Sequence, residues 1–186
     1  DLERFLEEVA RKIEKSLEEL RRVLEEVRDR IRRSLEENTK SLERLTEEVR
    51  RVLERLKDTD LDKKEVEDIE REVRRVERTM RELSKKARRD NTEMLRDLAR
   101  KVDEVEKENK RVLERLREKV KDSDDDEDKV AKEIEDEVRR LDEKNRKLAK
   151  EIRDEIRKLD KENKDLSKEL RDRVEELLRK IEETVR

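Results

Sequence analysis

The stretch LERFLEEVARKIEKSLEE, residues 2–19, decides the fold, because it returns with substitutions as LRRVLEEVRDRIRRSLEE at 20–37 and NTKSLERLTEEVRRVLER at 38–55. Apolar residues in these copies stand three or four positions apart, five to every 18 residues. This spacing is a period of about 3.6 residues, one turn of an α-helix. It predicts a helix with a straight apolar stripe, since a period of about 3.5 winds helices left-handed and about 3.67 right-handed.

The same helical period continues beyond these three copies. Residues 134–151 and 152–169 read IEDEVRRLDEKNRKLAKE and IRDEIRKLDKENKDLSKE, and residues 66–120 keep their apolar side chains in the same phase. A fixed internal repeat indicates that one structural unit recurs along the chain. The sequence therefore predicts three long helices of similar length and equal period.

Two Asp-rich segments mark the ends of these helices. They read KDTDLDKKE at 57–65 and KDSDDDEDK at 121–129. Asp is favoured at helix N-caps, and a glutamate follows both Asp62 and Asp124 by three positions, the spacing of a capping box. These segments predict helix boundaries rather than interruptions within one helix.

The predicted helices cover residues of about 2–57, 63–121 and 126–185. Connections this short make sequence neighbours antiparallel. We therefore predict an all-α fold, a straight, untwisted, up-down-up antiparallel three-helix bundle with 18-residue repeats, which forms a single domain over residues 1–186.

The composition favours long exposed helices over disorder. Charged residues make up 62% of the chain and hydrophobic residues 29%, yet 56 basic and 59 acidic residues are interleaved and leave a net charge of only −3. Blocks of like charge would indicate a disordered tail. The chain lacks Gly, Pro, Cys, His, Trp, Tyr and Gln. No apolar run approaches the length of about 20 residues that a membrane span needs. We expect a soluble chain whose sequence identifies no compartment.

Asparagine occupies core positions throughout the pattern. All five asparagines lie on the apolar phase of the repeat; they are Asn38, Asn91, Asn109, Asn145 and Asn163. An isolated asparagine is usually a surface or cap residue. Five of five on the apolar stripe indicate instead that polar residues were placed inside the bundle.

Residue numbers predict which polar residues meet. At one height of an antiparallel pair the two numbers have a constant sum, and the numbers of Ser16 with Asn109, and of Ser34 with Asn91, both add to 125. On the other pair of helices, Asn109 with Asn145 and Asn91 with Asn163 both add to 254. Two polar layers follow, namely Ser16, Asn109 and Asn145, and Ser34, Asn91 and Asn163.

The same arithmetic predicts a third, less regular polar region. Its pairs share either the sum of 125 or the difference of 129 that relates the first and third helices. Its members are Asn38, Ser41, Thr46, Thr79, Ser84 and Ser167. A buried amide without a partner costs about 1–3 kcal/mol, so we expect these groups to bond to one another. Paired, they would specify register and topology, with no catalytic role.

Four kinds of functional site are disfavoured by the residues present. A calcium loop over residues 122–133 would need glycine where Glu127 stands. Di-metal bundle sites use inward Glu-x-x-His ligands, but histidine is absent and the glutamates lie off the core phase. A single aromatic residue, Phe5, cannot form a stacking platform for nucleic acid. Without His or Cys, no serine has an activating base. We therefore expect no enzyme, metal or cofactor.

The whole chain resembles de novo designed, parametrically generated single-chain helical bundles with buried hydrogen-bond networks. The resemblance rests on the 18-residue repeat, the Ser/Asn/Asn layers, the Glu, Lys and Arg surface and the small residue alphabet. It implies a stable monomeric scaffold that needs no partner and has no evolved activity. Two alternatives stay open: a component of a designed oligomer, and a natural spectrin-like spacer, whose repeats usually carry core aromatic residues.

Overall fold

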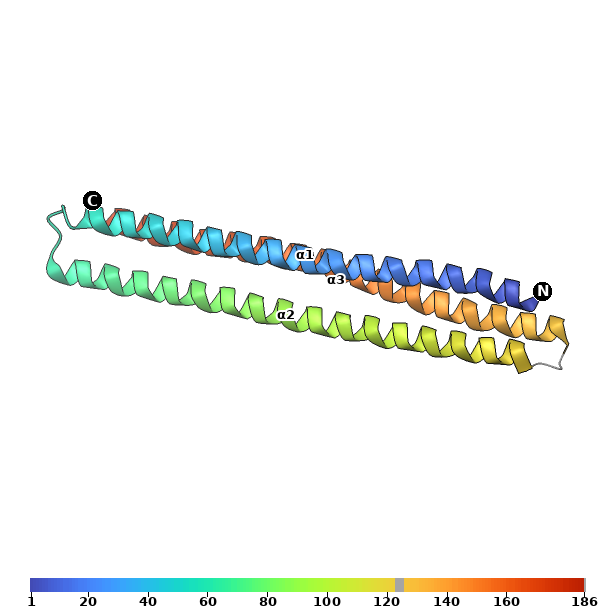
Figure 1. Ribbon diagram of the computed structural model, residues 1–186. Coiled ribbons are helices and arrows are strands. Elements are labelled where there is room, and N and C mark those ends of the chain that lie inside the picture. Colours follow the sequence, from blue (N-terminus) through green and yellow to red (C-terminus); the bar gives the residue numbers. More distant parts are fainter. Residues whose placement is uncertain (123–125, 186) are drawn as a thin grey trace. The chain divides into compact units, whose positions relative to one another are not determined.

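The computed structural model describes residues 1–122 and 126–185 and contains three helices (Figure 1). Helix α1 spans Leu2–Leu56, α2 spans Lys63–Asp122 and α3 spans Glu127–Val185. Over these described ranges no strand is present. The predicted all-α three-helix bundle is confirmed, with observed bounds within one residue of those expected. The straight path and the 18-residue repeat of the helices stay predictions.

Aspartates stand at the helix N-termini. The Asp1 carboxylate accepts a hydrogen bond from the backbone N–H of Glu3 at 3.3 Å, and the Asp126 carboxylate accepts one from the N–H of Asp128 at 3.3 Å. Asp62 directly precedes α2, as predicted from the capping spacing. The other predicted cap, Asp124, lies outside the described residues, and Asp126 takes the position before α3. The carboxylates of Asp1 and Asp126 satisfy N–H groups that have no partner within the helix.

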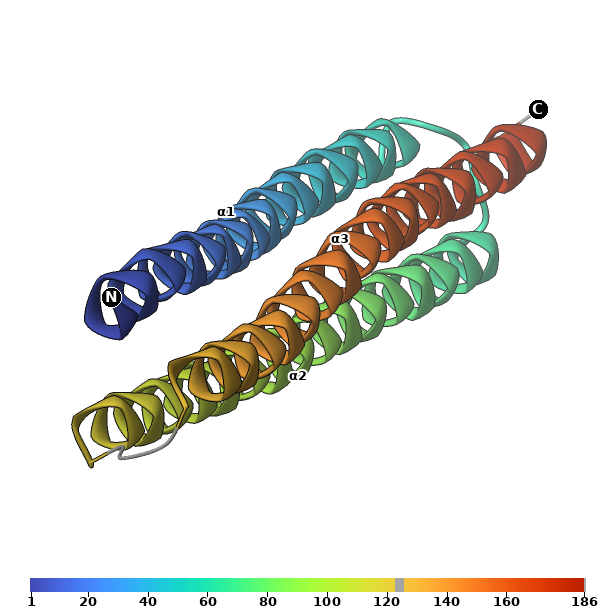
Figure 2. The same cartoon turned by 90° about the vertical axis from the view of Figure 1, so that its right-hand side faces the viewer.

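Segments of all three helices form two compact units. The first unit comprises Asp1–Asp29 and Glu93–Arg157, and the second comprises Arg30–Thr92 and Lys158–Arg186. In Figure 2 the first unit contains the dark blue part of α1, the yellow part of α2 and the orange part of α3. Each unit therefore has its own three-helix core. The single domain over residues 1–186 stays a prediction.

Ion pairs establish the helix directions in the first unit. Between α2 and α3, Lys144 contacts Glu108 at 2.7 Å and Lys101 contacts Glu151 at 2.7 Å, so residue numbers fall along one helix as they rise along the other. Between α1 and α2, Glu7 contacts Arg117 at 3.6 Å and Arg21 contacts Glu106 at 2.8 Å. Both neighbouring pairs of helices in this unit are antiparallel.

The second unit repeats this arrangement with other residues. Arg30 of α1 pairs with Asp160 of α3, and Ser167 of α3 donates to Asn38 of α1 at 3.4 Å. The numbers rise together along these two helices, so they run parallel. Across the antiparallel pair, Lys180 of α3 contacts Glu72 of α2 at 3.7 Å. The up-down-up order thus holds within each unit.

Apolar burial differs between the units. Of the described residues, 21 apolar side chains are buried in the first unit and 11 in the second. The buried cluster of the second unit, which includes Val49, Val73 and Leu170, is flanked by half-buried apolar side chains such as Val52 and Leu178. Burial of apolar surface is the main force that holds a bundle together. The second unit therefore leaves more of its apolar stripe in contact with water.

Candidate functional site

The predicted polar residues converge most closely at Asn109 and Asn145 in the first unit. Both side chains are only 1% exposed. The Nδ2 of Asn109 donates to Oδ1 of Asn145 at 3.2 Å, and the Nδ2 of Asn145 donates to Oδ1 of Asn109 at 3.0 Å. Asn109 Nδ2 also donates to the carbonyl of Val105 at 2.6 Å. Each amide thus has a partner for its donor and its acceptor, so this buried pair avoids the desolvation penalty of an unpaired group.

Ser16, the third member of this predicted layer, lies beside the pair without joining it. It is half-buried and lines a groove of about 460 Å³ with Val9, Ile13 and Val138. Over residues 1–122 and 126–185, its hydroxyl makes no hydrogen bond to either asparagine. The two amides already satisfy each other, and the short serine side chain faces a groove open to solvent. The hydrogen bonds of this predicted layer therefore join only Asn109 and Asn145, among the described residues.

Within the described part of the chain, no hydrogen bond joins the members of the second predicted layer. Asn91 is 5% exposed, and its Nδ2 is buried without a partner in the described part of the chain. Ser34 and Asn163 are only half-buried, and both line a groove between α1 and α3. Their polar atoms can turn to water, which removes the energetic need to reach Asn91. Two layers that look alike in the sequence thus differ in their bonding.

One pair of the predicted third region forms a contact between helices. Ser167 Oγ donates to Oδ1 of Asn38 at 3.4 Å, and their numbers differ by the predicted 129. Asn38 is 5% exposed, and its Nδ2 is buried without a partner among the described residues. This contact joins α1 to α3 within the second unit.

Among the residues that the structure describes, the remaining members of the third region do not hydrogen-bond to each other. Thr46 Oγ1 donates to the carbonyl of Leu42 at 2.8 Å, and Thr79 Oγ1 donates to that of Arg75 at 3.0 Å. A threonine hydroxyl in a helix reaches the carbonyl four residues earlier, and this local bond competes with bonds between helices. Ser41 and Ser84 are half-buried, and over the described ranges Ser84 Oγ has no partner. The residue numbers of each predicted pair place its two members at equal height along the helices, but equal height does not bring them into hydrogen-bond contact.

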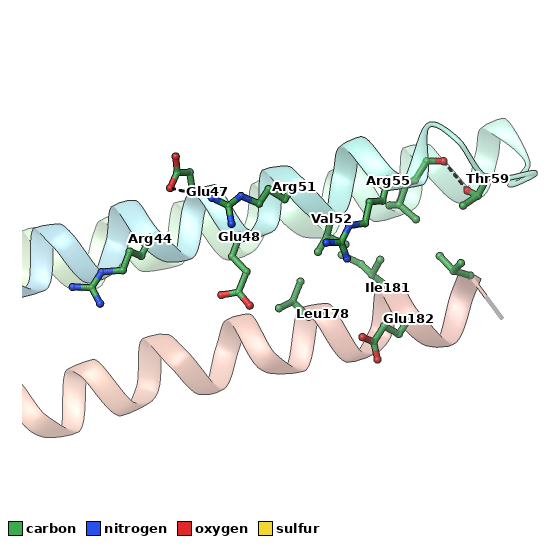
Figure 3. Close-up of a pocket in the computed structure, with 12 residues that line it drawn as sticks. Arg44, Glu47, Glu48, Arg51, Val52, Arg55, Thr59, Leu178, Ile181 and Glu182 are labelled. Carbon is green, nitrogen blue, oxygen red and sulfur yellow. Dashed lines mark hydrogen bonds and ion pairs between the residues drawn. The ribbon is translucent and has the colours of Figure 1, made fainter.

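A groove between α1 and α3 in the second unit was not predicted from the sequence (Figure 3). It has a volume of about 880 Å³, and its apolar lining includes Val52, Leu178 and Ile181. Figure 3 shows Glu48 of α1 extending towards α3 at its edge. The stripe pattern predicts which residues face inward, but it does not predict how completely a neighbouring helix covers them. That depends on the spacing of the helices.

The shifted pKa values belong to ion pairs between helices. A hydrogen bond from Lys119 lowers the pKa of the Glu133 carboxyl, and a hydrogen bond to Glu151 raises the pKa of Lys101. Neither pair lines any of five grooves found among the described residues. Across the described ranges, no group of three or more His, Cys, Asp or Glu residues is placed to hold a metal ion. No helix of the described chain has the length and apolarity of a membrane span.

Comparison with known proteins identifies no relative. The sequence matches no known protein family, no curated protein and no solved structure. The closed amide pair and the grooves beside α1 are therefore the features from which a function can be argued.

Proposed function

We propose that this chain is a designed structural scaffold whose buried polar pairs select one helix register. The reciprocal amide pair of Asn109 and Asn145 carries the proposal, because it lies inside an apolar core at the height that the residue numbers predict. A regular repeat alone does not distinguish one register from the next. Buried polar residues that bond only in one alignment provide that distinction.

The neighbouring core residues explain why the pair would discriminate. A slip of α3 by three or four residues against α2 keeps the apolar stripes facing inward, but it places Leu148 or Leu141 opposite Asn109. Both amides would then lose their partner inside the core, and each unpaired amide costs about 1–3 kcal/mol. A leucine pair at the same heights would tolerate the slip. The amide pair therefore opposes slipped packings more than it stabilises the native one.

The test compares registers in the full chain. Spin labels at Arg111 of α2 and Glu143 of α3, both exposed, report the alignment of the two helices as a distance distribution. We expect one narrow distribution for the parent chain and a broader or multiple one for the double variant Asn109→Leu/Asn145→Leu. An equally narrow distribution in the double variant, with melting as cooperative as in the parent, would refute the role in register.

A second candidate function is that of a component in an oligomer. It is supported by the second unit, where 11 buried apolar residues compare with 21 in the first and where Val52, Leu178 and Ile181 line the groove of Figure 3. Light scattering separates the candidates, because a monomer has a mass of 22.9 kDa at every concentration. A mass that rises with concentration would support assembly. The third hypothesis, a spectrin-like spacer, gains no support from the comparisons.

A further inference from the structure

Each helix of the second unit contains a long stretch without a buried apolar side chain. These stretches, all within the described part of the chain, together form the polar segment, namely residues 32–48 of α1, 81–92 of α2 and 160–169 of α3. In α1 of the first unit, by contrast, a buried apolar side chain recurs at least every fourth residue from Leu6 to Val27. The apolar core of the second unit is therefore interrupted.

The three stretches lie at overlapping heights along the second unit. The hydrogen bond from Ser167 Oγ to Asn38 Oδ1 at 3.4 Å aligns α3 with α1. The contact between Lys180 and Glu72 at 3.7 Å aligns α3 with α2. Since all helices advance by about 1.5 Å per residue, residues 160–169 lie beside the polar stretches of both other helices. The interruption thus crosses the whole core of the unit.

Nine buried apolar side chains of the described chain form a separate core beyond the polar segment. This end cluster draws its members from residues 49–56 of α1, 69–80 of α2 and 170–181 of α3. Two further buried apolar residues of the second unit, Ile31 and Leu159, lie on the other side of the polar segment and outside the cluster. The end cluster is therefore joined to them through half-buried and polar side chains, which contribute less to cooperative folding than buried apolar contacts do.

The polar segment itself is unfavourable when the helices are closed. Asn38 Nδ2, Ser84 Oγ and Asn91 Nδ2 are buried without a hydrogen-bond partner within the described ranges. A buried polar atom that lacks a partner has lost its hydrogen bond to water and has gained none in return. Separation of the helices returns all three atoms to water. The segment thus favours opening at the height where apolar burial is weakest.

We propose that the end cluster and the polar segment open together, as one reversible cooperative unit, while the first unit stays folded. Local unfolding of this kind occurs where few buried apolar contacts protect a segment. The first unit differs, because 21 of its described apolar side chains are buried and its Asn109 and Asn145 amides bond to each other. Opening separates α1 from α3 at the groove of Figure 3 and exposes the apolar side chains that line it.

Native-state hydrogen exchange of the full chain, followed by NMR at increasing guanidinium concentrations below the unfolding midpoint, tests this opening. We expect the amides of residues 49–56, 69–80 and 170–181 to share one opening equilibrium with a weak dependence on denaturant. The amides around the buried core of the first unit should exchange at least about tenfold more slowly and depend more steeply on denaturant, since only global unfolding exposes them. Equal protection and equal dependence in both groups would overturn the proposal.

Two matched substitutions in α3 distinguish partial from global opening. Ile152 of the first unit is 0% exposed and Ile181 of the end cluster is 2% exposed. Ile181→Val should speed exchange about two- to tenfold in both groups of amides, because both openings begin from the closed state that it destabilises. Ile152→Val should speed exchange by a similar factor in the first unit only, because its contacts persist when the end cluster opens. Faster exchange of the end-cluster amides in Ile152→Val would contradict the proposal.

Discussion

Asn109 and Asn145 each donate and accept one amide hydrogen bond across the core of the first unit, at 3.2 and 3.0 Å. Asn91 occupies the corresponding position in the second predicted layer, yet its Nδ2 has no partner among the described residues. Asparagines at equivalent positions of the repeat therefore differ in energy, because the amides of Asn109 and Asn145 are hydrogen-bonded and the Nδ2 of Asn91 is not. That contrast yields the first two predictions.

Replacing one member of the closed pair should destabilise the protein. In Asn145→Leu, the buried Oδ1 of Asn109 loses its donor, and we expect a loss of about 1–3 kcal/mol in the free energy of unfolding. Chemical denaturation followed by circular dichroism measures this change. The double variant Asn109→Leu/Asn145→Leu should recover most of the loss, because no amide is then left unpaired. A double variant that loses the sum of the two single losses would show that the two amides are not energetically coupled, which would contradict this prediction.

Asn91→Leu should behave in the opposite way. Since the Nδ2 of Asn91 lacks a partner, leucine removes an unfavourable buried donor and adds apolar burial, so stability should rise by about 1 kcal/mol. The same denaturation measurement tests it, with Asn145→Leu as the matched reference. The triple change Ser34→Val/Asn91→Val/Asn163→Ile should likewise preserve or raise stability. A loss in Asn91→Leu as large as in Asn145→Leu would mean that Asn91 is bonded in solution.

The loss of stability when a leucine of α3 is replaced by alanine should measure how fully the neighbouring helices bury that side chain. Leu170 is 0% exposed, so Leu170→Ala should lower stability by about 2–5 kcal/mol through lost burial and a residual cavity. Leu178 is half-buried beside the groove of Figure 3, and Leu178→Ala should cost clearly less. Both variants lie in the same helix and unit, so helix propensity cancels in the comparison. Equal losses would indicate that another molecule covers the groove.

Acid should remove the contribution of the ion pair between Lys119 and Glu133. The hydrogen bond from Lys119 lowers the folded-state pKa of Glu133 below its usual value. The pair thus stabilises the fold above the unfolded pKa of about 4.3, and this effect fades as the pH falls through the lower folded value. Glu133→Gln should therefore melt below the parent at about pH 7 and match it at about pH 2. The shift at neutral pH should be small, since exposed pairs contribute little. A difference that persists in acid would point to a cause other than charge.

The helices could be predicted closely because their signals are local. The 18-residue repeat indicates which positions face inward, and the Asp-rich segments contain the residues that satisfy free N–H groups at a helix start. Bounds within one residue at Leu56, Asp122 and Glu127 follow from this local chemistry. Residue numbers also predicted the pairing of Asn38 with Ser167, because antiparallel and parallel neighbours advance by equal steps along their axes.

The sequence by itself therefore determined the three helices, their apolar stripes and the heights at which polar residues meet, since backbone hydrogen bonds and helical periodicity depend on near neighbours. Only the tertiary structure decided which polar groups bond. Thr46 and Thr79 bond within their own helices, Ser16 stays outside the Asn109–Asn145 pair, and Asn38 keeps an unused donor. A hydrogen bond forms only over about 3 Å with a narrow range of angles, so it depends on the distance and rotation between helices, which equal height does not specify.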